Sequence, residues 1–164
     1  AMASKASIAG HPVHPMIVSF PLALWTTSFI ADLLFYFTRQ GTLPVIAKFL
    51  LAAGCIGAVA AAIPGLIDWL SIKHPGVKRI ANWHARLNII ALLIFATSLY
   101  LRMKSGGAAW VDYGMKIPFL LSLIGVILIS ISGWLGGALS FEHGVGVKPQ
   151  HDTPEDEVAK VRFP

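Results

Sequence analysis

The sequence predicts an all-α integral membrane protein folded as an antiparallel four-helix bundle with up-down-up-down topology. Of its 164 residues, 55% are hydrophobic and 13% are charged, and the mean hydropathy is +0.69. A soluble domain has about 25% charged residues. Four apolar segments are each long enough to cross a hydrocarbon core, which takes about 20 residues. The connections between them are short, so successive helices must run in opposite directions.

The chain divides into three parts. Residues 1–14 form an N-terminal segment with two His-Pro dipeptides, the second of which overlaps the start of the next part. Residues 15–143 form the membrane domain, with helices expected at about 15–37, 44–70, 83–101 and 117–141, and residues 144–164 form a polar tail. Lysine and arginine lie on both sides of the expected spans, where lipid headgroups account for them without a nucleic-acid partner.

Local signals support the first and third helices. Pro15 suits a first helical turn, where its missing N–H is not needed. The third helix is expected to begin near Trp83, after a basic loop at 71–82. Within it, His84 and Asn88 are one turn apart and therefore share a face.

The second and fourth helices each carry a face of small residues. Counting back by turns from Asp68 gives Gly65, Ala61, Gly57 and Gly54. Counting back from His143 gives Ser140, Gly136 and Ser132. Such faces allow close helix packing, within the chain or in a homodimer, and they also leave room for a flat cofactor. Pro64 is expected to distort the second helix near its end.

The topology brings five candidate ligands to one membrane rim. The first and third helices begin at this rim, and the second and fourth end there. These positions hold His11, His14, Asp68, His84 and His143. Asp32 lies about 27 Å beyond His14 along a helix axis and so belongs to the opposite rim. There we expect an interfacial salt bridge with one of three basic residues, which are Arg39, Lys48 and Arg102.

Imidazoles gathered at one rim indicate a haem or metal site. Neutral imidazole is the commonest side-chain metal ligand, and two imidazoles can hold a haem iron. We expect His14 and His84 to be the axial pair of a haem b, with His143 and His11 as further candidates. Four other side chains are expected to orient these ligands, relay protons or pair with propionates. They are Asp68, Asn88, Trp134 and Arg86.

Two alternatives stay open. The five rim ligands would equally suit a non-haem zinc, copper or iron ion in a membrane enzyme or a metal-handling protein. A cofactor-free scaffold subunit, whose histidines hydrogen-bond to carbonyls and headgroups, explains any single histidine at least as well. The residues alone assign no reaction.

Three motifs stand out, GHPVHPMIVSFPLAL at 10–24, AAIPGLIDW at 61–69, and GWLGG followed by HGVGV within 133–147. They resemble a bacterial membrane-protein family catalogued as domain of unknown function twenty-two thirty-one. The resemblance implies a four-span membrane protein, loosely similar to small b-type cytochromes, with some relatives fused to or encoded beside Rieske-type iron-sulfur domains. It also implies that function rests on His11, His14, Asp68, His84 and His143.

The leading hypothesis is a multi-pass protein of the bacterial inner membrane that transfers electrons through haem b. Its partners would be a quinone or another membrane pool and a soluble redox protein, of the Rieske or another type. Lysine and arginine are more numerous at the histidine-bearing rim, which favours a cytoplasmic position for that rim.

Overall fold

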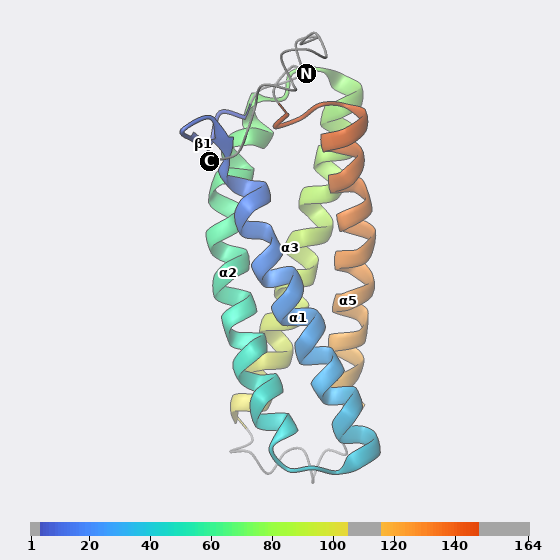
Figure 1. Cartoon of the computed structure of the whole chain (residues 1–164). Helices are drawn as coiled ribbons and strands as arrows, with labels where there is room; N and C mark the ends of the chain where they lie inside the picture. Colours follow the sequence, from blue (N-terminus) through green and yellow to red (C-terminus); the bar gives the residue numbers. More distant parts are fainter. Residues whose placement is uncertain (1–3, 105–115, 148–164) are drawn as a thin grey trace, which may run out of the picture.

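A computed structural model describes residues 4–104 and 116–147 and confirms the helical membrane fold (Figure 1). Helix α1 spans Val13–Thr38, α2 spans Leu43–Ser71, α3 spans Pro75–Lys104 and α5 spans Lys116–Gly137. These helices run alternately down and up in the view of Figure 1. All are long and apolar enough to cross a membrane. We call the end where α1 begins and α5 ends the histidine rim. The expected tail beyond residue 147 lies outside the described residues.

Helix α3 begins at Pro75, so the expectation of a loop up to Asn82 was wrong. Val77 and Ala81 are one turn apart, and both are buried with Ile72 and Leu139. This apolar contact stabilises the first turns of α3, and the link between α2 and α3 shrinks to 72–74. The observed first and last residues of α1 and α2 lie within two residues of the bounds expected from the sequence.

Short irregular pieces complete the histidine rim. Strand β1, Ser7–Ile8, pairs antiparallel with β2, His11–Pro12. The turn between them needs positive φ at both of its residues, and Gly10 adopts 76° without strain. Helix α5 continues into a π-helix, η1, at Ala138–Glu142.

The bundle consists of two helical hairpins. Helix α1 packs mainly on α2, which we call the first hairpin, and α3 packs mainly on α5, the second hairpin. Fewer contacts join α2 to α3 and α1 to α5. Helices α1 and α3 are therefore diagonal neighbours across the bundle axis, as Figure 1 shows with α3 behind α1.

The two hairpins are structural repeats of each other. Inward-facing residues of α1 recur 70 positions later in α3, as in the pairs His14 and His84, Trp25 and Phe95, Ser28 and Ser98, and Asp32 and Arg102. Residues of α2 recur 71 positions later in α5, as in the pairs Ala47 and Pro118, Gly54 and Gly125, Ala61 and Ser132, and Gly65 and Gly136. The offset increases from 70 to 71 because the second hairpin has one more residue between its equivalent positions than the first.

Equivalent residues make equivalent contacts. Ser28 Oγ donates to Ala47 O at 2.8 Å, and Ser98 Oγ donates to Pro118 O at 3.3 Å. A Cβ atom on Gly54 would lie 2.5 Å from Trp25 Cδ1, and one on Gly125 would lie 2.5 Å from Phe95 Cζ. An approximate twofold axis along the bundle therefore relates the hairpins, as in membrane proteins built from parallel repeats.

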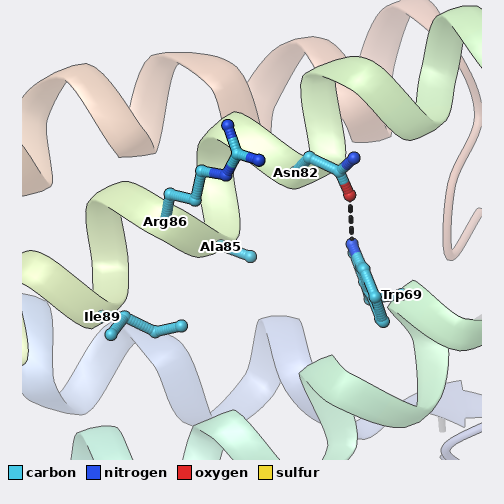
Figure 2. A pocket seen from close by; sticks show the side chains of 5 residues that line it. All are labelled: Trp69, Asn82, Ala85, Arg86 and Ile89. Carbon is cyan, nitrogen blue, oxygen red and sulfur yellow. Dashed lines mark hydrogen bonds between the residues drawn. The ribbon is translucent and has the colours of Figure 1, made fainter.

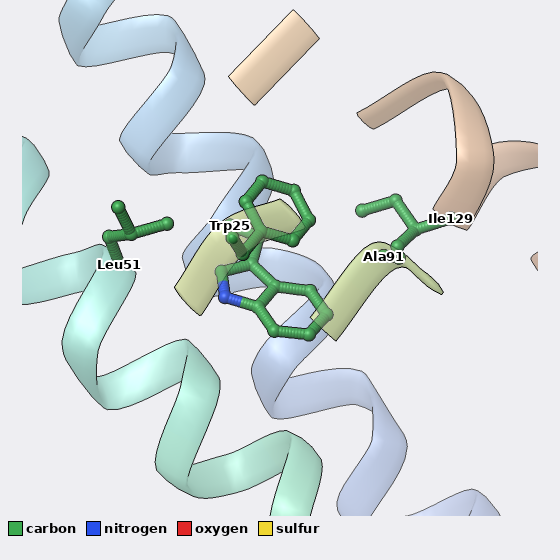
Figure 3. Close-up of a cluster of buried hydrophobic side chains, with 5 residues drawn as sticks. Trp25, Leu51, Ala91 and Ile129 are labelled. Atoms are coloured by element: carbon green, nitrogen blue, oxygen red, sulfur yellow. The ribbon is translucent and has the colours of Figure 1, made fainter. Parts of the chain in front are cut away.

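Two aromatic rings meet on this axis in the middle of the bundle. Trp25 and Phe95 are stacked, with ring centroids 4.3 Å apart and planes 20° from parallel. Leu51, Ala91 and Ile129 surround them (Figure 3). Glycine is required at the facing position of each hairpin because the rings approach the backbone so closely.

A buried ion pair crosses the axis nearer the opposite rim. Arg102 Nη1 donates to Asp32 Oδ1 at 2.9 Å and Nη2 donates to Oδ2 at 2.6 Å, and both side chains are 0% exposed. Arg102 also donates to Ser122 Oγ at 3.0 Å and to Ser98 Oγ at 3.2 Å. This network ties α1, α3 and α5 together.

The expectation of an interfacial salt bridge at Asp32 was wrong about its environment. Arg102, one of the three expected partners, binds Asp32, but it does so inside the bundle. Arg39 lies over the Tyr36 ring instead, and Lys48 lies over the Phe49 ring. The pair is buried because both residues lie on inward faces at the same depth of diagonal helices.

We expect Arg102→Met to lower the unfolding free energy by about 3–5 kcal/mol, because it leaves the Asp32 carboxylate buried without its partner. Adding Asp32→Leu should recover most of this loss, because no buried charge remains. Thermal unfolding in detergent, followed by circular dichroism, measures both effects. Lys104→Met, on an exposed residue of the same helix, should unfold like the wild type. Equal unfolding midpoints for the single and double variants would contradict this role.

Candidate functional site

Two imidazoles face each other across the axis at the histidine rim. The ring centroids of His14 on α1 and His84 on α3 are 6.3 Å apart, and the planes are 89° from parallel. Each histidine lies eleven residues before the aromatic residue of its own helix, Trp25 or Phe95, and so on the same inward face. The repeat therefore places one histidine on each side of the axis.

Backbone carbonyls fix both rings in the same way. His14 Nδ1 donates to Ala61 O of α2 at 2.8 Å, and His84 Nδ1 donates to Ser132 O of α5 at 2.8 Å. A carbonyl oxygen only accepts hydrogen bonds, so each Nδ1 carries a proton. In the neutral ring the lone pair then lies on Nε2.

Asn88 and Ser132 hold His84 in a second set of hydrogen bonds. Asn88 Nδ2 donates to Ser132 Oγ at 2.8 Å and to His84 O at 2.9 Å, and it lies 3.1 Å from His84 Nε2. The amide carries two hydrogens for these three acceptors. The expected proximity of Asn88 to His84 is therefore confirmed, and the contact with Nε2 is the longest of the three.

Two glycines make room for the rings. A Cβ atom at Gly65 would lie 2.8 Å from His14 Nδ1, and one at Gly136 would lie 3.1 Å from His84 Cε1. A side chain at either position would push the imidazole away from its carbonyl. The small faces expected on the second and fourth helices thus make room for the histidines at Gly65 and Gly136 and for the two aromatic rings at Gly54 and Gly125.

Asp68 binds the N-terminal segment. Its carboxylate accepts hydrogen bonds from Ser4 Oγ at 2.8 Å, from the Lys5 backbone N–H at 2.8 Å and from the Ala6 backbone N–H at 3.1 Å. Three donors saturate most of its acceptor capacity. The structure thus gives Asp68 a part in positioning the chain before β1, apart from the two facing histidines.

The other two histidines lie at the rim without joining the pair. His11 is exposed in β2, and His143 is half-buried just after η1. Within residues 4–104 and 116–147, no group of three or more His, Cys, Asp or Glu side chains is placed to hold a metal ion. The structure therefore gathers His14 and His84 and leaves apart the remaining three of the five expected ligands.

Two expected supporting residues point away from the imidazoles. Trp134 is 80% exposed, because it is half a turn from Ser132, which faces the axis. Arg86 is exposed with its guanidinium 5.5 Å from the centre of the Trp83 ring. Neither side chain contacts His14 or His84, and their expected supporting roles stay a prediction.

A family model described as "Predicted membrane protein (DUF2231)" matches residues 10–149. The chain belongs to this family. The resemblance of the three sequence motifs is therefore confirmed. A search of curated proteins and a search of solved structures find no match. The family description states a membrane location and no activity. A functional proposal for this DUF2231 protein therefore rests on the geometry of its own site.

Sequence reasoning missed three features of this DUF2231 site. It did not find the carbonyl of Ala61, the carbonyl of Ser132, or the repeat that makes them equivalent. The signal was present in the sequence as identical residues at offsets of 70 and 71. They include His14 and His84, Thr27 and Thr97, Ser28 and Ser98, Gly54 and Gly125, and Gly65 and Gly136.

We expect Asp68→Ala to release the chain before β1, because three hydrogen bonds to residues 4–6 are lost. Trypsin should then cleave after Lys5 several times faster than in the wild type. Limited proteolysis with mass spectrometry measures this rate, and unchanged cleavage after Lys104 in the same sample is the control. An unchanged rate at Lys5 would show that Asp68 does not hold this segment.

Proposed function

We propose that this protein binds one b-type haem between His14 and His84 and transfers electrons through it. The observation that carries the proposal is the pair of facing imidazoles, each with Nδ1–H donated to a carbonyl. Two imidazoles would suffice to hold a haem iron. A structural or catalytic zinc ion takes three or four protein ligands. The geometry at the rim supports the first arrangement better.

The spacing of the two rings fits a shared metal centre. Two imidazoles that share one metal ion would have to lie close together, since a metal–nitrogen bond is about 2 Å long. His14 and His84 have centroids 6.3 Å apart. The donor chemistry also fits, since both Nδ1 atoms are protonated and the lone pair of each neutral ring lies on Nε2.

The protein's own groups prepare this site. The carbonyls of Ala61 and Ser132 each accept the Nδ1–H of one histidine, which fixes the orientation of both rings. Asn88 can release His84 Nε2 and still use both of its hydrogens, on His84 O and Ser132 Oγ. A bound haem would supply a one-electron couple at this rim.

The position of His14 and His84 near the rim supports electron exchange with partners in the bilayer and in the aqueous phase. His14 is the second residue of α1 and His84 is the tenth of α3, so both lie close to the rim. In this proposal a quinone reaches the site from the inner-membrane bilayer, and a soluble redox protein, of the Rieske or another type, reaches it from the aqueous side.

The test is the visible spectrum of protein purified in detergent from cells supplied with haem precursor. We expect a Soret band that shifts on reduction with dithionite, together with split bands in the green that indicate low-spin haem. His14→Ala and His84→Ala should each abolish the low-spin spectrum, because one axial ligand is lost.

His74→Ala is the matched control, since His74 is exposed in the link between α2 and α3. It should retain the wild-type spectrum. Circular dichroism of each variant checks that the helices are intact. Folded wild-type protein without a Soret band would refute the proposal and favour a cofactor-free bundle. A haem spectrum unchanged in both alanine variants would refute the assignment of His14 and His84.

A further inference from the structure

An open pocket of about 240 Å³ lies between α2 and α3 on the outer side of α3 (Figure 2). Its lining residues are Trp69, Asn82, Ala85, Arg86 and Ile89. Asn82 and Arg86 lie on the face of α3 opposite to His84 and Asn88. The pocket is therefore separate from the histidine pair, although both lie near the same rim.

The free polar groups of this pocket are hydrogen-bond donors. Asn82 Oδ1 accepts from Trp69 Nε1 at 2.7 Å, which leaves the Asn82 amide hydrogens available. Arg86 makes no hydrogen bond with another residue in the described part of the chain. Figure 2 shows the Asn82 and Arg86 side chains projecting from neighbouring turns of α3. A ligand of this pocket must therefore present acceptor oxygens.

The charge of the surroundings is positive. Arg86 carries a permanent charge, and none of the five lining residues is acidic. The Lys78 ammonium lies over the Trp69 ring, 3.5 Å from its centre, and donates to Trp69 O. Its charge therefore stays at the rim end of the pocket. Guanidinium and amide donors beside a cation favour a phosphate group.

Polarity changes along the pocket in the direction of the membrane. Asn82 and Arg86 lie toward the rim, and Ile89 follows one turn deeper along α3. Ala85 and the Trp69 ring complete an apolar wall. An amphiphile with its headgroup at the rim and a chain pointing inward matches this order, whereas a free anion would leave the apolar part uncovered.

We propose that this pocket binds an anionic phospholipid, with the headgroup phosphate on Arg86 and Asn82 and the start of an acyl chain along Ala85 and Ile89. Basic pockets between transmembrane helices commonly take such headgroups. A quinone has the apolar chain but only neutral carbonyl acceptors, so the positive charge selects against it.

The test is native mass spectrometry of the full chain from nanodiscs that contain equal amounts of phosphatidylglycerol and phosphatidylcholine. We expect phosphatidylglycerol to be retained preferentially. Arg86→Gln should weaken its retention roughly tenfold, because a charge-assisted hydrogen bond is lost. Ala85→Leu keeps the charge but fills the apolar wall, and it should weaken retention as well. Arg79→Gln removes an exposed charge outside the pocket and should leave retention unchanged.

Four outcomes would overturn the proposal. Equal retention of the two lipids would show that charge does not select the ligand. Retention unaffected by Arg86→Gln would place the lipid elsewhere. Displacement of the lipid by inorganic phosphate, with Ala85→Leu having no effect, would indicate a site for the free anion. Displacement by a short-chain ubiquinone would indicate a quinone site.

Discussion

The lack of water inside a bilayer is the constraint on which this fold depends. A polar side chain placed there has to find a partner within the protein, because an unsatisfied group costs several kcal/mol. Here the polar groups turn toward the axis of the bundle. Asp32 and Arg102 satisfy each other, and the histidine N–H groups use carbonyls of the helix beside them. Each such bond fixes the rotation of a helix about its own axis.

The repeat explains why the site forms where it does. Each hairpin carries a histidine, an aromatic residue and a serine at the same spacing, so pairing the hairpins about one axis brings like residues together. At the histidine rim the result is two imidazoles that face each other across the axis. Nearer the opposite rim the paired residues differ, and opposite charges replace like side chains. This difference lets the two hairpins pair in one defined way.

Much of the fold could be predicted from the sequence, because apolar length alone identifies membrane helices. The alternation of direction then placed the histidines on one rim. Helical counting on single helices could not show that His14 and His84 meet while Asp68 turns to residues 4–6, because that depends on packing between helices. It also could not place Asp32 inside the bundle, since the depth of Arg102 on a diagonal helix decides this.

The equivalence of the two hairpins is tested most directly by exchanging the charges of the buried pair, with Asp32→Arg and Arg102→Asp in one protein. Each position follows a serine by one turn, Ser28 or Ser98, and each serine donates to a carbonyl of the adjacent helix. The measurement is the thermal unfolding midpoint of the exchanged protein and of both single reversals.

If the hairpins are repeats about one axis, the exchange restores most of the stability that either single reversal removes. It should fall short by about 1 kcal/mol, the worth of one hydrogen bond, because Leu51 occupies the place equivalent to Ser122. An exchanged protein as unstable as the single reversals would contradict the twofold relation between the hairpins.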